Sequence, residues 1–236
     1  MEVSIATLQI WLPLVIAALV QASFGLGVSM LTLLSGHLLS DERSAARLHK
    51  LTVSYILGFG LAVFTSMIAS LYILSFFDFT SSKEFWLILT GAAVGVGLAV
   101  ILFYYRWDKH GTQLWLSRRT AAYLQTRTKA TRSSFEAFAL GIAAMVAELL
   151  FVATPIVMAA NLALELNGVA QILSIVVYVL ITLVPLIILF FFNHRGKRIS
   201  TFIKWREKHK KFLQVMAGGI LIMLGFYLLT YKVLGG

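Results

Sequence analysis

The sequence contains no cysteine, and charged residues make up only 13% of its 236 positions. The absence of cysteine excludes disulfides, iron–sulfur clusters, thiolate metal sites and thiol redox chemistry. An average soluble domain has about 25% charged and roughly 45–50% apolar residues, whereas this chain is 59% hydrophobic. This composition excludes a water-soluble fold, so the long apolar runs become the main source of information.

Six apolar segments of about 20 to 30 residues account for most of the chain, and each can cross a hydrocarbon core of roughly 30 Å as a helix. We therefore expect an all-α, polytopic membrane protein with six transmembrane helices. The expected spans are residues 10–36, 51–76, 85–105, 135–161, 169–193 and 212–231. The connections between them leave little room for an extramembrane domain.

Basic residues are distributed unevenly between the two ends of these spans. Of the twenty lysines and arginines, eighteen lie in the loops that follow the first, third and fifth spans, and only Lys83 and Lys232 lie at the other end. The positive-inside rule then predicts that the three basic loops are cytoplasmic and that both termini lie outside. This distribution explains the net charge of +10 without nucleic acid, and it fits a multi-pass protein of the bacterial cytoplasmic membrane.

The longer basic loops also carry apolar residues at helical spacing. Within residues 195–211, Ile199, Phe202 and Ile203 recur among lysines and arginines, and residues 112–126 have a similar pattern. We expect both segments to form helices that lie in the membrane interface against anionic lipid. The simpler alternative is that they are orientation anchors with no further role. Nothing supports nucleic-acid binding beyond the interleaving of aromatic and basic residues.

The two halves of the chain show signs of duplication. Residues 16–21 read IAALVQ and residues 142–148 read IAAMVAE, and both matched spans are overlong, with about 30 mostly apolar residues where about 20 suffice. Each half holds three spans, an odd number, so the halves would have opposite orientations and form an inverted 3+3 repeat. The expected division is a first three-helix half (1–105), a basic cytoplasmic linker (106–134) and a second three-helix half (135–236).

Helix-breaking residues follow the matched stretch in both overlong spans. Gly25 and Gly27 weaken helix geometry in the first span and allow close backbone approach. Pro155 in the fourth span cannot donate a backbone N–H, so we expect a kink or interruption there. Interrupted helices at corresponding positions of two halves are the best sequence indication of a transporter's binding site near the bilayer midplane. Helices 1 and 4 are therefore predicted to be broken.

Glu148 is the one charged residue in the apolar interior of the fourth span. A carboxylate near the bilayer centre costs roughly 2.5–3.5 kcal/mol or more unless it is protonated, paired or open to a water-filled cavity. We expect Glu148 to be neutral when dehydrated and ionised when it faces water or holds a cation, which suits a proton relay or a cation site. The alternative is a protonated Glu148 that only hydrogen bonds to another helix.

No basic residue falls within the apolar interior of any span, so the candidate partners of Glu148 are neutral. They are Gln21, Thr154, Ser54, Tyr55, Tyr178 and Thr182. Gln21 is favoured because the pseudo-symmetry places its amide opposite Glu148, although a lone glutamine in a span is often interhelical glue. The predicted substrate and proton-coupling residues are thus Glu148, Gln21 and Thr154. The helix breaks predicted to line the site are Gly25, Gly27 and Pro155.

The motifs of several enzyme classes are absent, including His-Glu-x-x-His, Gly-x-Ser-x-Gly and the phosphate-binding Gly-x-x-x-x-Gly-Lys-Ser/Thr. The five histidines are spaced too irregularly for a dedicated metal site. We therefore expect no enzyme activity, cofactor or metal. Gly91 and Gly95 form a small-residue face that allows close packing within the bundle or between the protomers of a homo-oligomer.

This layout resembles the LysE / DsbD–CcdA / TauE group of small bacterial transporters. The likeness lies in the six spans, both ends outside, the three-plus-three arrangement, the broken first and fourth helices and the basic loop that joins the halves. Redox members of that group carry a cysteine next to proline in the first and fourth spans, and only Pro155 of that pattern is present here. The resemblance therefore implies export of a small solute or ion and not electron transfer.

The predicted function is secondary transport of a small solute or ion by alternating access, coupled to protons through Glu148. Two other classes stay open. One is a non-transporting scaffold, assembly factor or immunity protein that holds a protein or lipid partner through its glycine faces and basic helices. The other is an enzyme or flippase that acts on a lipid head group, whose phosphates the basic loops would gather.

Overall fold

The structure is a computed structural model, which describes residues 5–24, 26–39, 45–76, 82–103, 105–108, 111–114, 123–124, 126–128, 130–193 and 199–234. Its long helices are α1 (Ile5–Ser23), α2 (Leu26–Leu39), α3 (Ala45–Ser75), α4 (Lys83–Phe103), α6 (Ser134–Leu164), α7 (Val169–Asn193) and α8 (Ile199–Leu229), the last continued by a π-helical turn (Thr230–Leu234). Two short strands, β1 (Tyr105–Asp108) and β2 (Gly111–Leu114), lie between α4 and α6.

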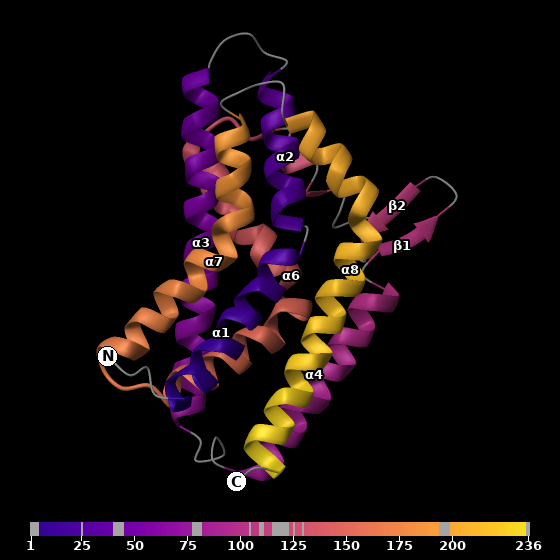
Figure 1. Cartoon of the computed structure of the whole chain (residues 1–236). Coiled ribbons are helices and arrows are strands. Elements are labelled where there is room, and N and C mark those ends of the chain that lie inside the picture. Colours follow the sequence, from indigo (N-terminus) through magenta and orange to yellow (C-terminus); the bar gives the residue numbers. More distant parts are fainter. Residues whose placement is uncertain are drawn as a thin grey trace.

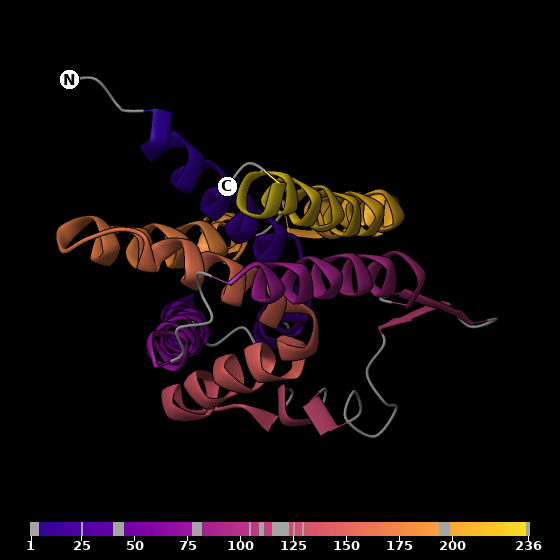
Figure 2. The ribbon, with the colours of Figure 1, turned by 90° about the horizontal axis from the view of Figure 1, so that it is seen from below.

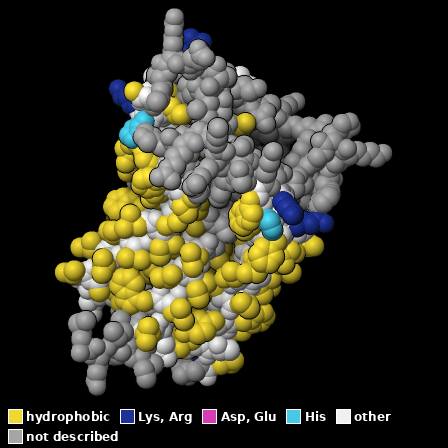
Figure 3. Space-filling view, turned by 45° about the horizontal axis from the view of Figure 1, so that its top comes forward, with side chains coloured by type: hydrophobic (Ala, Val, Ile, Leu, Met, Phe, Trp, Pro, Cys, Tyr) yellow, Lys and Arg dark blue, Asp and Glu magenta, His cyan; other side chains and the backbone are white. Residues whose placement is uncertain are grey.

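Five of these helices are long and apolar enough to cross a membrane, and α1 with α2 makes a sixth if the bent pair is one span. Large apolar side chains are exposed along them, for example Leu57 (61%), Tyr72 (64%) and Ile88 (73%). Figure 3 shows such side chains over a broad area of one face, with the visible lysine and arginine side chains toward its upper part. Because a contiguous apolar surface of this extent is rare on soluble monomers, these features indicate a multi-pass membrane protein.

Helices α1 and α2 run in the same general direction and the helices after them alternate, so the start of α1 and the end of α8 lie at the same end of the bundle (Figure 1). At this end Lys232 forms an ion pair of 2.6 Å with Glu165, the C-cap residue of α6. At the opposite end the Arg47 guanidinium donates a hydrogen bond of 3.1 Å to the Arg132 carbonyl, which ties the start of α3 to the residues before α6. This contact brings together described parts of the first and second basic loops.

Helix α6 lies at the centre of the bundle, in contact with α1, α2, α3, α4 and α7. Within its most apolar stretch 56% of the residues are buried, against 28% in α7. The six consecutive residues Met158–Ala163 are all buried, so this part of α6 is covered on every side. The sequence therefore places its single intramembrane carboxylate, Glu148, on the most enclosed helix.

Facing glycines bring two helix pairs into backbone contact. A Cβ atom added to Gly58 of α3 would collide with the Phe138 carbonyl of α6, and one added to Gly141 of α6 would collide with the Tyr55 carbonyl of α3. The pair formed by α4 and α8, which run side by side in Figure 2, is packed in the same way through Gly97 and Gly218. Small residues permit this close approach in membrane helices.

Gly91 and Gly95 behave differently from these packed glycines. Both are exposed, and an added Cβ at either position would have no described atom within 4 Å. The prediction that they pack inside the bundle is therefore wrong for the described part of the chain, because α4 turns its other face toward α8 and α6. Their use between protomers stays a prediction.

The prediction that the fourth helix is interrupted is also wrong, whereas the alternative of a kink at Pro155 stays a prediction. Helix α6 runs without a break from Ser134 to Leu164 with Pro155 inside it, and α1 and α7 likewise contain Pro13 and Pro185. Proline has a helical φ and removes one hydrogen bond, and neighbouring helices can compensate for this loss in a membrane bundle. The predicted break in the region of the first span, in contrast, is present, because α1 and α2 are separate helices bent by 45° relative to each other.

The basic linker contains a structure that the sequence pattern did not predict. The stretch 112–126, expected to be an interfacial helix, begins in the strand Gly111–Leu114, which pairs antiparallel with Tyr105–Asp108, with Tyr105 opposite Leu114. Its described residues 123, 124 and 126 are helical. Residues 115–122 lie outside the described part. The other basic stretch is helical as expected, because α8 begins at Ile199 and continues directly into the last span. The inverted repeat and the division at 105 and 134 stay predictions.

Candidate functional site

The first span is broken between α1 and α2, whose axes differ by 45°. The last turn of α1 closes through a hydrogen bond of 3.2 Å from the Phe24 N–H to the Gln21 carbonyl, and the Ser23 hydroxyl donates to the Val20 carbonyl. Gly25 lies outside the described residues, so its predicted role is not assessed. The break leaves the first N–H groups of α2 without an intrahelical partner.

Glu148 of α6 supplies an acceptor for one of these groups. The Leu26 N–H, at the start of α2, donates a hydrogen bond to Glu148 Oε1. The Glu148 side chain is only 2% exposed. Since the N-terminus of a helix carries a partial positive charge, it is a favourable place for a carboxylate. One partner of Glu148 is therefore a backbone group, whereas the candidates predicted from the sequence are all side chains.

Helix α3 holds the start of α2 from another side. The Tyr55 hydroxyl, fully buried, donates a hydrogen bond of 2.9 Å to the Gly27 carbonyl. A Cβ atom at position 27 would lie 2.8 Å from the ring of Phe59, so Gly27 does allow the close approach predicted for it. Tyr55 was one of several candidate partners of Glu148, and it lies in the same cluster but bonds to α2.

Gln21 pairs with α7. The Tyr178 hydroxyl donates a hydrogen bond of 2.6 Å to Gln21 Oε1, and Tyr178 is fully buried. The amide nitrogen of Gln21 is buried and has no hydrogen-bond partner among the described residues. The expected pairing of Gln21 with Glu148 is therefore wrong, because Tyr178 orients the carboxamide and the Leu26 N–H takes the carboxylate.

Two further polar residues of α6 lie apart from Glu148. Thr154 is 7% exposed and stands six residues along the helix, roughly 9 Å at 1.5 Å per residue. No hydrogen bond in the described part joins it to Glu148 or Gln21, so its predicted place in the site stays a prediction. Asn161, the expected last residue of the fourth span, lies inside α6 at 2% exposure with its amide nitrogen unpartnered among the described residues. The apolar run that continues to Leu166 was the signal that the helix ends later.

These contacts define the break cluster: Gln21, the Leu26 N–H, Gly27, Tyr55, Glu148 and Tyr178. It joins four spans, because the broken pair α1 and α2 meets α3, α6 and α7 there. Within the described residues, no three histidine, aspartate or glutamate side chains come close enough together to hold a metal ion. The cluster therefore offers one buried carboxylate, one unpartnered amide donor and a helix N-terminus.

The fold and this cluster define a class, a helical multi-pass membrane protein with a buried polar centre at a helix break. Comparison with protein-family models, with curated protein sequences and with solved structures gives no match to this chain. Assignment beyond that class therefore depends on the geometry of the break cluster.

Proposed function

We propose that this protein is a secondary transporter of a small solute or ion, coupled to protons through Glu148. The observation that supports the proposal is the hydrogen bond between the buried Glu148 carboxylate and the N–H that opens α2. Ionisable residues inside spans are costly and usually serve ion or proton pathways. Broken helices whose N-termini face a polar centre are typical of transporter binding sites.

The same hydrogen bond provides a coupling mechanism. A bond to an ionised carboxylate is roughly twice as strong as a neutral one, and the ionised form is also attracted by the helix dipole. Protonation of Glu148 therefore weakens the hold of α6 on α2. The two-state element in this mechanism is the position of α2 relative to α6, with the break between α1 and α2 acting as the hinge.

Solute binding would use the unpartnered donor of the cluster. The amide nitrogen of Gln21 is buried without a partner in the described part of the chain, and such a group costs free energy until an acceptor satisfies it. A solute that carries an oxygen acceptor satisfies this amide. The substrate class is thus an oxygen-bearing solute that binds beside Glu148.

A thermal-unfolding screen of the detergent-purified protein tests the binding part of the proposal. Amino acids, organic anions and metal ions are added at two pH values to wild type, to Glu148→Gln and to the matched control Glu84→Gln, which changes an exposed glutamate at the start of α4. A ligand at 100 times its Kd adds about 2.7 kcal/mol of stability. We expect a ligand that stabilises wild type and the control but not Glu148→Gln.

Transport itself is tested in proteoliposomes that contain a pH-sensitive dye. Addition of the solute found in the screen should acidify or alkalise the lumen with wild type and with Glu84→Gln, and Glu148→Gln should abolish the signal. Equal proton movement with Glu148→Gln would refute the coupling role. A different result would favour a partner-binding scaffold over a transporter. In that result no compound stabilises wild type, and the stability of wild type and of Glu148→Gln responds identically to pH.

A further inference from the structure

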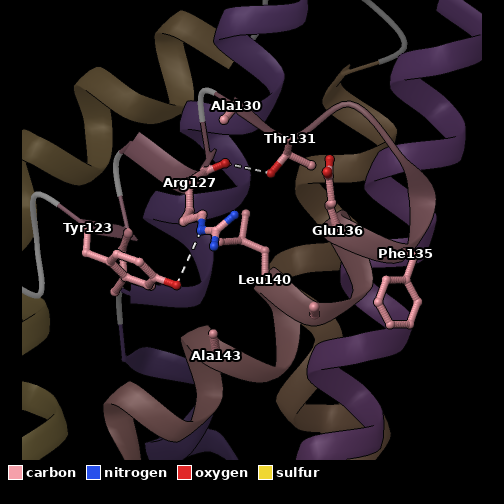
Figure 4. Close-up of a pocket in the computed structure, with 10 residues that line it drawn as sticks. Tyr123, Arg127, Ala130, Thr131, Phe135, Glu136, Leu140 and Ala143 are labelled. Carbon is pink, nitrogen blue, oxygen red and sulfur yellow. Dashed lines mark hydrogen bonds between the residues drawn. The ribbon is translucent and has the colours of Figure 1, made fainter.

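A second feature lies away from the break cluster, where the chain enters α6. It is a pocket of about 270 Å³ between the residues that precede α6 and the first turns of that helix (Figure 4). The preceding segment contributes Tyr123, Leu124, Arg127, Ala130 and Thr131, and α6 contributes Phe135, Glu136, Ala139, Leu140 and Ala143. Glu148 does not line this pocket, so the pocket is separate from the proposed transport site.

One side of the pocket carries a positive charge. The Arg127 Nε donates a hydrogen bond of 3.3 Å to the Tyr123 hydroxyl, and the guanidinium carbon lies 5.6 Å from the centre of the Tyr123 ring (Figure 4). These contacts hold the guanidinium in place at the pocket. Its two terminal nitrogens have no hydrogen-bond partner in the part of the chain that the structure describes, so they are available to a ligand.

The one acidic side chain of the pocket is already engaged. Glu136 Oε2 accepts hydrogen bonds from the backbone N–H groups of Arg132 (2.7 Å) and Ser133 (3.1 Å), and the Ser133 hydroxyl accepts from the Glu136 N–H. This reciprocal arrangement is a capping box that fixes the start of α6. No ion pair between Glu136 and Arg127 occurs among the described residues. The carboxylate therefore bonds to the helix end, and the Arg127 charge lies near enough to attract it but makes no direct ion pair with it in the described part.

The other side of the pocket is apolar and continues along α6. Phe135 is 78% exposed at its mouth, and the small side chains of Ala139 and Ala143 line its wall. Val146 (56% exposed) and Leu150 (66%) follow at helical spacing on the same face of α6. An apolar track thus runs from Arg127 toward the middle of the bilayer.

We propose that this pocket binds one anionic phospholipid of the leaflet that faces the basic loops. The phosphate pairs with the terminal nitrogens of Arg127, and an acyl chain lies over Ala139 and Ala143 toward Val146. Guanidinium groups bind phosphate through two parallel hydrogen bonds, and exposed aromatic residues such as Tyr123 and Phe135 are typical of the level of the head groups. The pocket combines the Arg127 cation, whose terminal nitrogens have no hydrogen-bond partner among the described residues, with a long apolar track, and this combination matches an amphiphile and not a small polar anion.

Native mass spectrometry of the intact protein, released from detergent, tests this proposal. The probes are phosphatidylglycerol, phosphatidylcholine with the same acyl chains, and sn-glycerol 3-phosphate. We expect one tightly retained phosphatidylglycerol per chain, with phosphatidylcholine retained about tenfold less well. Equal retention of the two lipids would overturn the proposal. Competition by glycerol phosphate at concentrations similar to those of the lipid would do so as well, since it would indicate a phosphate site without an acyl-chain contribution.

Three variants locate the lipid. Arg127→Gln removes the charge and should weaken phosphatidylglycerol retention about tenfold, which corresponds to one charge-assisted contact. Ala139→Leu fills the apolar track at an exposed position and should weaken retention of both lipids several-fold without a change in charge. Lys50→Gln, which removes an exposed charge near the start of α3 outside the pocket, is the matched control. If Arg127→Gln retains lipid as well as Lys50→Gln does, the pocket is not the binding site.

Discussion

The first span and the fourth span carry different helix-breaking residues, and only the first is broken. Helix α6 passes through Pro155 and stays helical for 31 residues, whereas the chain between α1 and α2 bends by 45° next to its glycines. A proline inside a helix loses one hydrogen bond. A complete break leaves several backbone groups of both helix ends without partners.

The difference shows that a break inside a membrane bundle requires a partner from elsewhere. At the start of α2 the partners are Glu148 of α6 and Tyr55 of α3, which bond to the Leu26 N–H and the Gly27 carbonyl. In return, the helix N-terminus stabilises the Glu148 carboxylate. The helix break and the buried acid therefore stabilise each other: Glu148 accepts a hydrogen bond from the N–H that the break leaves free, and that N-terminus stabilises the carboxylate.

The largest effect is expected from Gly141→Val, which would push the continuous helix α6 away from α3. The close packing that holds α6 in place would then be lost. The new Cβ collides with backbone atoms of Tyr55 and Phe59, which cannot move aside as a flexible side chain can. Overpacking of this kind usually costs about 1–3 kcal/mol and occasionally more, and backbone contact places Gly141→Val at about 3 kcal/mol. The midpoint of thermal unfolding in detergent, followed by tryptophan fluorescence, measures the loss.

Gly95→Val is the matched control for this variant, because position 95 is exposed and an added Cβ has no described atom within 4 Å. We expect its unfolding midpoint to stay close to that of wild type. An equal loss in both variants would show that glycine flexibility, and not the contact between α3 and α6, determines the result.

A smaller effect is expected from Glu148→Ala, which tests whether the break depends on its acceptor. The change leaves the Leu26 N–H buried without this acceptor, a loss of about 2 kcal/mol for an unsatisfied group. Hydrogen–deuterium exchange should accelerate in peptides that cover residues 24–28. Glu148→Gln keeps an acceptor oxygen and should change exchange less. Unchanged exchange in Glu148→Ala would contradict the role of Glu148 as a helix cap.

The smallest effect is expected from Pro155→Ala, which makes the fourth span an ordinary helix. The new N–H can bond to the Phe151 carbonyl, so the unfolding free energy should rise by no more than about 1 kcal/mol. Exchange at residues 24–28 should stay as in wild type, because Pro155 does not take part in the break. Faster exchange there would mean that the two spans are coupled through the proline after all.

Most of the coarse architecture could be predicted from the sequence, because hydrocarbon thickness and the uneven distribution of basic residues are strong constraints. The long apolar helices, the break near Gly27 and the isolation of Glu148 are examples. The partner of Glu148 could not be predicted, because it is a backbone N–H, and every residue except proline has one. Which N–H becomes free depends on where the helix ends, and sequence patterns place helix ends poorly.

The errors have related physical causes. Pro155 was given too much weight as a helix breaker, because tertiary packing can compensate for one missing hydrogen bond. The fourth span is longer than expected, because α6 continues past Asn161 to Leu164 and buries Asn161. The strands at Tyr105–Leu114 lie in a basic stretch with a weak helical pattern, where hairpin pairing outweighed that pattern.

Glu148 lies in α6, the fifth of the seven long helices that the structure describes, and this position also bears on how the chain is assembled during synthesis. Helix α2, with its open N–H at Leu26, and helix α3, with Tyr55, leave the translocation channel before α6 does. When Glu148 enters the bilayer, the Leu26 N–H that donates a hydrogen bond to its carboxylate is already there. Because of this order of synthesis, Glu148 does not enter the lipid as an unpaired carboxylate, which would cost several kcal/mol of free energy. A circular permutation that delivered α6 first would lose this advantage without altering any contact of the finished fold.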